Sequence, residues 1–584
     1  MDIFNVLTMI GGLCLFMFGM NIMGQALERR AGDKLRSLLG KLTTGKAAGL
    51  LTGLGVTAVI QSSSAVTVMV VGFVNSGLMT LKQAINVIMG ANIGTTVTAW
   101  ILSLAGIDSG NIFVKLLKPT SFTPILALVG IILYMFCKNS KKNDTGMILL
   151  GFATLMFGME TMSGAVSGLG SIPAFQNLFI LFKNPILGLL AGAVLTAIIQ
   201  SSSASVGILQ ALAVTGQVSY GAAIPIIMGQ NIGTCVTAML SSVGANKNAK
   251  RAAMVHLSFN VIGSVVWLAV FCVIKAVFTP VILNESASLF GIAVAHSAFN
   301  VLCTILMLPL TGFLEKMVNK LLPDTKQQET ESDLDERLLT TPSIALERCH
   351  EVAVKMAKTA VATLTEGLDS LHRYTPELSE SIHKKEEITD RYEDMLGTYL
   401  VHLSTKQISE QDSAEAAKLL KIIGDFERIA DHGVNLLDSA EEMKEKGVSF
   451  TNSAESEFQV ISSAVYEILK LALTAFLNDD ITAAEKVEPL EQVIDILKEK
   501  LRTSHILRMQ QGACSIDAGF VWSDLLTNLE RTSDHCSNIA GCVIDIAHRN
   551  MNIHESLRDF RNDNEDFRTQ FKVYKEKFKL PENN

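Results

Sequence analysis

The stretch TAVIQSSSA at residues 57–65 returns almost unchanged as TAIIQSSSA at residues 196–204. Two more pairs share the same offset of 139 residues: FMFGM at 16–20 with LMFGM at 155–159, and IMGANIGTTVTA at 88–99 with IMGQNIGTCVTA at 227–238. Chance similarity between apolar segments would give scattered Leu, Ile and Val matches, but not Gln-Ser-Ser-Ser and Asn-Ile-Gly-Thr at one offset. The first half of the chain is therefore an internal duplication.

Charge separates this duplicated half from the rest of the chain. Residues 1–322 contain 8 Asp and Glu and 19 Lys and Arg, whereas residues 323–584 contain 49 and 30. Few charges together with long apolar segments are typical of a membrane domain, and the acidic second half is typical of a water-soluble one. The surplus of acid argues against nucleic acid as a partner, because phosphate backbones are bound by Lys and Arg.

The first half contains apolar segments long enough to be candidates for crossing a lipid bilayer, which takes about 20 helical residues. Two of them are interrupted by Gly, Ser and Thr, and therefore suit re-entrant hairpins better than single crossings. These two are 47–76 and 185–216; the others are 4–25, 84–105, 121–137, 147–166, 223–243, 253–279 and 287–310. We predict an all-α fold with a polytopic membrane domain at 1–322, whose repeats span about 4–137 and 147–279.

Basic clusters set the orientation of these segments. Lys and Arg concentrate at 28–46, 138–142 and 247–251, and such loops are predicted to be cytoplasmic. Each repeat then crosses the membrane three times, so the two copies face opposite ways. Inverted repeats with interrupted segments are typical of secondary transporters, with the site at the repeat interface. A duplicated scaffold in which small residues only pack helices closely is the alternative, but it would not require Gln and Asn at fixed places.

The repeated residues are polar but uncharged. Their hydroxyl and carbonyl oxygens are suitable ligands for Na⁺, and N–H groups at the N-termini of half-helices can hold a tetrahedral oxyanion. The two segments contain no Asp, Lys or Arg, which argues against a proton relay and favours Na⁺ coupling. The candidate substrate and sodium ligands are Gln61, Ser62, Ser63, Ser64, Asn92, Thr95, Thr96, Gln200, Ser201, Ser202, Ser203, Asn231 and Thr234.

With paired QSSS motifs, each followed by G-x-N-I-G-T, the first 315 or so residues resemble the type II sodium–phosphate (Na/Pi) cotransporter family. The resemblance implies inorganic phosphate as the substrate, Na⁺ as the coupling ion, and a site formed by the two QSSS segments. Cys235 replaces the counterpart of Thr96, which argues against a ligand role for Cys235. His256 and His296, in HLSFN and HSAFN, are interpreted as interhelical hydrogen-bonding residues in preference to gating residues.

The second half carries a duplication of its own. GDFERIADHGVN at 424–435 matches TNLERTSDHCSN at 527–538, and each copy places Glu and Asp four residues apart on one helix face. We expect a mobile acidic linker at 323–342 and a soluble helical bundle domain at 343–584. Helices are predicted at 343–372, 379–404, 409–446, 454–478, 480–507, 517–550 and 557–577.

This helical half resembles the PhoU family over about 343–550. The resemblance implies a regulator of phosphate transport built from two three-helix bundles. It also implies a divalent metal on Glu427, Asp431, Glu530 and Asp534, although a solvated acidic face remains the alternative. Further contributors on the preceding helices are Glu387, Asp390, Asp394, Glu488, Glu491 and Asp495.

Taken together, these features predict sodium-coupled phosphate transport by alternating access, with a cytoplasmic PhoU-like domain regulating a multi-pass protein of the plasma (cell inner) membrane. A phosphate exporter and a membrane-anchored phosphate sensor with little transport are the alternatives. We do not expect an enzyme, because the sequence has no P-loop, nucleophile elbow or HExxH motif. A homo-oligomer or a cytoplasmic regulatory partner is compatible with the sequence.

Overall fold

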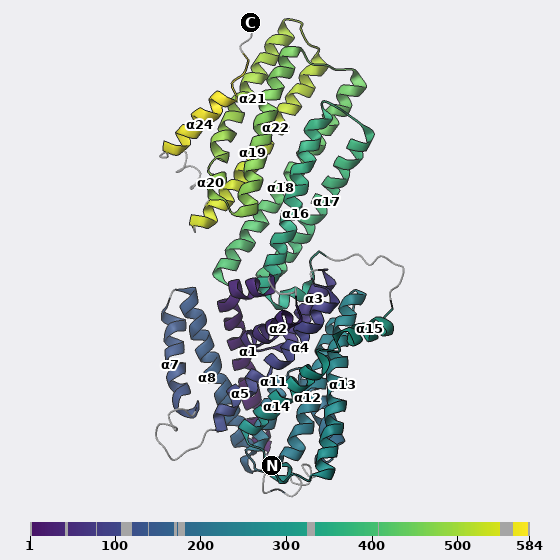
Figure 1. Ribbon diagram of the computed structural model, residues 1–584. Helices are drawn as coiled ribbons and strands as arrows, with labels where there is room; N and C mark the ends of the chain where they lie inside the picture. The colour runs from purple at the N-terminus through teal and green to yellow at the C-terminus, as the bar shows by residue number, and fades with distance from the viewer. Residues whose placement is uncertain are drawn as a thin grey trace. The chain divides into compact units, whose positions relative to one another are not determined.

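The described part of the chain is mostly helical. A computed structural model describes residues 3–40, 45–77, 79–106, 119–137, 139–168, 172, 181–323, 333–406, 408–548 and 565–581. Helices make up 86% of the structure, and the described residues form no strand. The all-α prediction is therefore confirmed (Figure 1).

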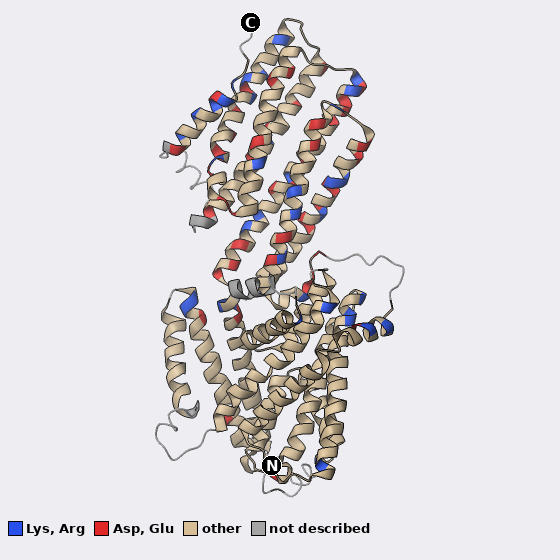
Figure 2. Cartoon of the chain, in the orientation of Figure 1, with Lys and Arg blue, Asp and Glu red and all other residues tan. Residues whose placement is uncertain are grey.

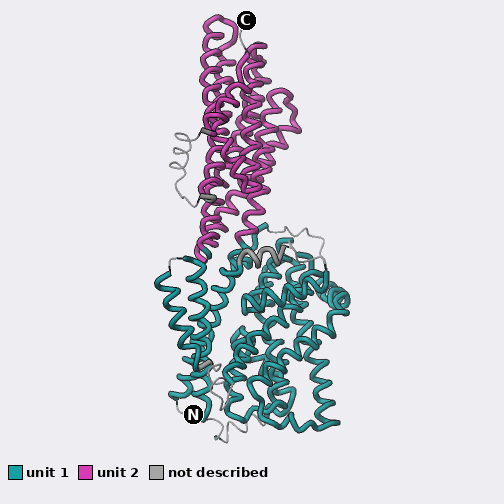
Figure 3. Tube along the Cα trace, turned by 60° about the vertical axis from the view of Figure 1, so that its left-hand side comes forward, with its two compact units in different colours: residues 1–345, 407–409 teal, residues 346–406, 410–584 magenta. Residues whose placement is uncertain are grey.

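The chain divides into two compact units (Figure 3). Unit 1 comprises residues 1–345 with 407–409, and unit 2 comprises residues 346–406 with 410–584. The helices of unit 1 are α1 (Ile3–Gly40), α2 (Lys46–Ile60), α3 (Ser63–Asn75), α4 (Leu81–Gly94), α5 (Thr96–Ser103), α7 (Pro119–Phe136), α8 (Ser140–Ser167), α10 (Pro185–Ile199), α11 (Ser202–Ala213), α12 (Tyr220–Ser241), α13 (Lys247–Val277), α14 (Leu289–Met307) and α15 (Thr311–Leu321).

Seven helices in the described part of the chain are long and apolar enough to cross a membrane. Six of them belong to unit 1, and the seventh, α19 (Asn452–Asn478), belongs to unit 2. The two interrupted segments form shorter helix pairs, α2–α3 and α10–α11, as expected for hairpins. Helix α1 extends beyond the predicted 4–25 segment, into the basic region. Figure 2 shows that the Lys and Arg of unit 1 gather mostly at one end of its helices, where α15 and the start of α13 lie.

Glycines allow the same close helix packing in both repeats. A Cβ built on Gly53 of α2 would lie 1.9 Å from the Val87 carbonyl oxygen of α4. One built on Gly192 of α10, at the equivalent place, would lie 2.1 Å from the Ile226 carbonyl oxygen of α12. Backbones that approach this closely leave no room for any side chain. The recurrence of this contact in both repeats shows that the duplication in the sequence is also a duplication of structure.

Helices α1 and α8, which carry the FMFGM and LMFGM motifs, pack against each other through glycines. Gly12 approaches Gly158, and Gly19 approaches Gly151, with built Cβ atoms 2.6–3.0 Å from the facing carbonyl oxygens. The repeat offset of 139 residues relates Gly12 to Gly151 and Gly19 to Gly158, so the two contacts are equivalent when the repeats are exchanged. A partly buried ion pair between Arg29 Nε and Asp144 Oδ1, 2.8 Å apart, joins the same two helices.

The second half of the predicted linker is a folded part of unit 1. Leu338 is fully buried and Asp335 is 2% exposed, and the short 3₁₀ helix η4 (Glu336–Thr340) packs against α3. The expectation of a mobile spacer therefore fails for residues 333–341, because Asp335 and Arg337 pair with each other and with unit 1 and do not remain solvated. Residues 324–332 lie outside the described part of the chain.

Unit 2 is a set of long amphipathic helices. They are α16 (Pro342–Ser370), which begins in unit 1, α17 (Pro376–Ser404), α18 (Glu410–Lys446), α19 (Asn452–Asn478), the short α20 (Ile481–Ala484), α21 (Val487–Gln510), α22 (Ile516–His548) and α24 (Glu565–Lys577). The predicted 480–507 helix is divided into α20 and α21. Helices α18 and α22, which carry the duplicated motif, pack directly against each other.

Candidate substrate and ion site

Each QSSS segment forms a sharp break between two half-helices. Gln61 ends α2 with φ 59° and ψ 22°, and Gln200 ends α10 with φ 58° and ψ 22°. Residues other than glycine rarely adopt this left-handed conformation, and it persists only where the surroundings enforce it. Two matching instances at the repeat offset show that the break is built into each repeat.

The serine after each glutamine caps the next half-helix. Ser62 Oγ accepts a hydrogen bond from the Ala65 N–H at 3.2 Å, and Ser201 Oγ accepts one from the Ala204 N–H at 3.2 Å. Ser63, Ser202 and Ser203 are buried in the first turns of α3 and α11, whereas Ser62, Ser64 and Ser201 are partly exposed. Helix N-termini carry partial positive charge and free N–H groups, so each break presents an anion-binding end.

Thr98 of α5 joins the first break to the second repeat. Its hydroxyl donates to Gln61 Oε1 at 2.9 Å, and it accepts from Ser203 Oγ at 3.4 Å. Thr98 is 2% exposed. The structure therefore brings Gln61 and Ser203, which lie in different QSSS segments, to one shared threonine.

The two repeats are not in the same local arrangement. Gln61 is 6% exposed and bonded to Thr98, whereas Gln200 is exposed. Thr237, the counterpart of Thr98, has a buried hydroxyl with no hydrogen-bond partner among the described residues. The first break is thus closed by a contact that the second break lacks.

The first Asn-Ile-Gly-Thr segment reaches a neighbouring helix. Asn92 Nδ2 of α4 donates to Asn260 Oδ1 of α13 at 3.0 Å, and Asn92 Oδ1 lies 3.3 Å from His256 Nε2. His256 thus makes the interhelical contact expected for it. In the second repeat Cys235 occupies the place of Thr96, and Asn260 Nδ2 also donates to its Sγ at 3.2 Å.

The remaining candidate residues of these segments bond to carbonyls three or four residues before them. Such bonds satisfy the donors and leave lone pairs on the oxygens free for a ligand. Thr95, Thr96, Asn231 and Thr234 donate to the carbonyl oxygens of Ala91, Ile93, Ile227 and Gln230, at 3.1, 2.8, 3.1 and 2.9 Å.

Several buried polar atoms of unit 1 have no hydrogen-bond partner among the described residues. Both side-chain polar atoms of Gln230 are in this state, as are Thr57 Oγ1 and Asn300 Oδ1. Leaving a polar group unsatisfied in an apolar interior is costly. An ion, an oxyanion or water beside any of these atoms would therefore have a protein partner there.

In unit 2, one acidic cluster has the geometry of a metal site. Carboxylate oxygens of Glu491 and Asp495 of α21 and Asp534 of α22 all lie within 4.8 Å of one another. Burial, then repulsion from Glu530 and Asp495, raises the pKa of Asp534 to about 6. Of the four predicted metal ligands the structure places Asp534 in this cluster, while Glu530 pairs with Lys498 Nζ at 2.8 Å.

The equivalent carboxylates of α18 form a second acidic group. Burial, followed by repulsion from Asp431, raises the pKa of Glu427 to about 7. Burial, then repulsion from Asp431 and Asp390, raises the pKa of Glu386, and burial, then repulsion from Asp394 and Asp390, raises the pKa of Glu393. Negative charge is therefore concentrated in this part of α17 and α18.

A two-fold pattern of polar contacts links α18 to α22. His432 Nδ1 lies 2.9 Å from Asn528 Oδ1, and His535 Nδ1 lies 2.8 Å from Asp425 Oδ1, with the two imidazole rings 5.6 Å apart between centroids. His432 and His535 are 103 residues apart, as are Asp425 and Asn528. Burial lowers the pKa of His432. The duplicated motif thus also forms the seam between the two halves of unit 2.

Comparison with known proteins agrees with this architecture. Residues 15–164 and 173–302 match the family described as Na+/Pi-cotransporter, and residues 353–440 and 459–543 match the PhoU domain. The chain belongs to the Na+/Pi-cotransporter family and carries a C-terminal PhoU domain.

Relatives extend over one or both units. The candidate inorganic phosphate export protein YjbB of Escherichia coli K12 is 24% identical over 550 residues, covering 93% of this chain and 98% of that protein. Sodium-dependent phosphate transport protein 2A of Rattus norvegicus is 39% identical over 103 residues, covering 17% of this chain and 16% of that protein. A crystal structure of PhoU from Pseudomonas aeruginosa covers 35% of this chain and 97% of that chain, with 22% identity and a TM-score of 0.33.

Sequence reasoning missed Thr98 and Asn260 as members of the site region. Thr98 lies within the repeated GANIGTTVTA segment, so its recurrence as Thr237 was a usable signal. Asn260 lies in HLSFN, in which a role was predicted only for His256. Neither long-range hydrogen bond can be read from local pattern.

Proposed function

We propose that the protein transports inorganic phosphate across a membrane, coupled to Na⁺, by alternating access of its two repeats. The observation that carries this proposal is the matched pair of helix breaks at Gln61 and Gln200, each followed by a serine-capped half-helix. In transporters built from inverted repeats, such discontinuous helices bind substrate and ions near the middle of the membrane.

Phosphate suits the two half-helix N-termini. They offer serine hydroxyls and backbone N–H groups to the oxyanion, and the helix dipoles favour negative charge there. Neither QSSS segment contains an acidic residue that would repel phosphate. Na⁺ suits the same region because hydroxyl, amide and backbone oxygens are hard ligands, and its charge would offset that of the anion.

The difference between the repeats supports alternating access. In the present arrangement Gln61 is closed onto Thr98 while Gln200 is exposed. Exchange of these two arrangements between the repeats would expose the site first on one side and then on the other. The matched local geometry of the two breaks makes such an exchange possible without new types of contact.

Uptake of ³²P-phosphate into proteoliposomes, with and without a Na⁺ gradient, tests the proposal. Ser62→Ala and Ser201→Ala should each abolish the Na⁺-dependent component. Ser288→Ala is the matched control, because Ser288 also caps a helix, α14, by accepting from the Gly291 N–H at 2.9 Å, but lies outside both motifs. Normal uptake in both QSSS variants would overturn the site assignment.

Net export of phosphate is the second candidate. It is favoured by the relative named as an inorganic phosphate export protein, whose similarity extends over both units. The same transporter can run in either direction according to the gradients. Phosphate accumulation in cells that lack the protein would favour export, and reduced accumulation would favour import.

For unit 2 we propose a cytoplasmic regulatory role, with a divalent metal held by Glu491, Asp495 and Asp534. Three carboxylates from two helices are oxygen ligands of the kind that hard cations take. The Lys and Arg of unit 1 gather mostly at one end of its helices, and the positive-inside rule predicts that this end faces the cytoplasm of a plasma-membrane protein. Flux measured with and without residues 346–584 would test the regulatory role.

A further inference from the structure

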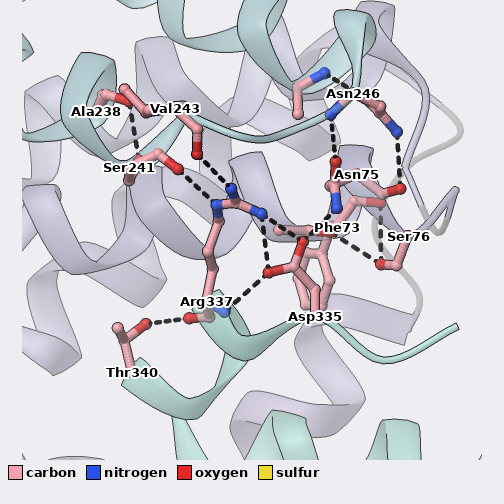
Figure 4. A network of polar contacts seen from close by, with 12 residues as sticks. Phe73, Asn75, Ser76, Ala238, Ser241, Val243, Asn246, Asp335, Arg337 and Thr340 are labelled. Carbon is pink, nitrogen blue, oxygen red and sulfur yellow. Dashed lines mark hydrogen bonds and ion pairs between the residues drawn. The ribbon is translucent and has the colours of Figure 1, made fainter. Parts of the chain in front are cut away.

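Residues 333–341, here called the strap, cross from the first repeat to the second within unit 1 (Figure 4). Asp335 binds the end of α3, because Asn75 Nδ2 donates to Asp335 Oδ2 at 2.6 Å. Arg337 binds the end of α12, with Nε donating to the Ser241 carbonyl at 2.5 Å and Nη2 to the Val243 carbonyl at 3.1 Å. One short segment therefore bonds to both repeats.

Hydrogen bonds and an ion pair within the strap also fix its conformation. Arg337 Nη1 lies 2.9 Å from Asp335 Oδ2, and the Arg337 N–H donates to Asp335 Oδ1 at 2.8 Å. The buried charge of Asp335 is thus paired with the partly buried charge of Arg337. The cation also meets carbonyls at the C-terminal end of α12, where a helix is partially negative.

Asn75, which binds the strap, also binds Asn246 and so connects the two repeats. The Asn246 N–H donates to Asn75 Oδ1 at 2.7 Å, and Asn246 Nδ2 donates to the Asn75 carbonyl at 2.8 Å. Asn246 also caps α13 by accepting from the Ala249 N–H at 2.9 Å. The last residue of α3 is therefore held to the turn between α12 and α13 from two sides.

An apolar contact completes the attachment. A Cβ built on Gly72 of α3 would lie 3.0 Å from Leu338 Cδ2, and Leu338 is fully buried. The preceding chain is anchored as well, since Arg251 Nη2 donates to the Leu322 carbonyl at 2.6 Å and Lys247 Nζ to the Pro323 carbonyl at 2.7 Å. After Thr341 the chain enters α16, which continues into unit 2.

We propose that the strap is an autoinhibitory latch, which holds the first hairpin closed on the second repeat until the strap is released. The proposal rests on transport by alternating access. The first break is the closed one, with Gln61 bonded to Thr98, and its half-helix α3 is the one the strap holds. For the repeats to exchange arrangements, α3 must move relative to the α12–α13 turn, and the strap opposes that movement. Because α16 follows directly, a change in unit 2 has a covalent route to the latch.

The test compares Arg337→Ala with Glu336→Ala in the full chain. Glu336 is exposed on the same 3₁₀ turn, so its loss changes the charge of the strap without touching the bonds to either repeat. Arg337→Ala should raise the initial rate of phosphate flux by about tenfold or more, since one charge-assisted hydrogen bond is worth that factor and Arg337 makes several. Hydrogen exchange should accelerate at 333–341 and at the break around residues 60–65. Glu336→Ala should leave both quantities at the wild-type level.

A second pair of variants keeps the test decisive if Arg337→Ala does not fold. Asn75→Asp still accepts from the Asn246 N–H but repels Asp335, so it should release the strap. Adding Asp335→Asn restores a donor and an acceptor between the two positions and should return flux and exchange toward wild type.

Two results would overturn the latch. The first is faster hydrogen exchange of the strap together with unchanged or slower phosphate flux, and the second is hydrogen exchange of the strap that these substitutions do not change. If the wild type carries no phosphate at all, the proposed function fails. Exchange around residues 60–65 then decides the latch by itself, because a freed strap must loosen the first break and an unchanged break refutes it.

Discussion

Gln61 and Gln200, 139 residues apart, adopt the same left-handed backbone conformation, but only Gln61 is closed by a threonine of its own repeat. The shared backbone conformation is built into each repeat, whereas the hydrogen bond that closes only Gln61 belongs to the conformational state of the transporter seen here. This separation makes the contact between Gln61 and Thr98 the most direct target for mutation.

Thr98→Ala should reduce phosphate flux by roughly tenfold, because it removes a donor that the closed arrangement itself needs, whereas release of the strap only lets that arrangement open. The substitution leaves the buried amide oxygen of Gln61 without its donor, which costs about 1–3 kcal/mol. Initial ³²P rates in proteoliposomes measure the effect. Thr154→Ala is the control, because the Thr154 hydroxyl bonds only to the Leu150 carbonyl of its own helix α8. Equal rates in the two variants would show that Thr98 has no part in the site.

Gly53→Val should prevent unit 1 from folding, whereas Gly55→Val on the same helix should be tolerated. A Cβ on Gly53 would lie 1.9 Å from a backbone oxygen of α4, but one on Gly55 meets nothing within 4 Å. Overpacking against backbone costs about 1–3 kcal/mol or more. Yield and thermal stability in detergent provide the measurement. A stable Gly53→Val protein would contradict the close approach of α2 and α4.

The stability of unit 2 should fall as the pH rises from about 4.5 toward 7 in the absence of divalent ions. Burial and repulsion raise the pKa of Glu427 from 4.5 to about 7, so the folded state retains a proton that the unfolded state releases at lower pH. This contribution is fully present below 4.5 and is lost as the pH rises through 7. Hydrogen exchange of α18 in the full chain would follow it. Glu427→Gln should flatten the profile, and the exposed Glu445→Gln on the same helix should not.

Divalent cations should protect unit 2 more strongly at pH 8 than at pH 5.5. The cluster of Glu491, Asp495 and Asp534 must lose its protons to bind a metal, and the pKa of Asp534 is raised to about 6. Calorimetric titration with Mn²⁺ and with Mg²⁺ would measure binding directly. Asp534→Asn should abolish it, while Asp524→Asn, an exposed position on α22, should leave it intact. Binding that survives Asp534→Asn would place the metal elsewhere.

Local pattern was sufficient where the structure depends on local chemistry. The interruption of segments 47–76 and 185–216 and most helices of unit 2 follow from small residues and apolar periodicity, whereas the left-handed glutamines and the capping serines were not predicted. The strap was predicted to be part of a mobile linker because the stretch 323–342 is acidic and bounded by prolines, although it also contains Leu334, Leu338 and Leu339. The pairing of Asp335 with Arg337, Asn75 and the carbonyls of α12 depends on elements far apart in sequence. Thr98 and Asn260 were missed for the same reason, and Glu491 and Asp495 could be named only as further contributors.

The glycine contacts between α1 and α8 have a consequence for a repeat taken alone. Gly12 meets Gly158 and Gly19 meets Gly151, so one repeat carries both halves of the surface that it presents to the other. That is the geometry of an isologous, self-complementary dimer interface. A single repeat would thus contain everything needed to pair with a second copy of itself in the opposite orientation, and the fused chain preserves, as an internal seam, what would otherwise be a contact between two subunits.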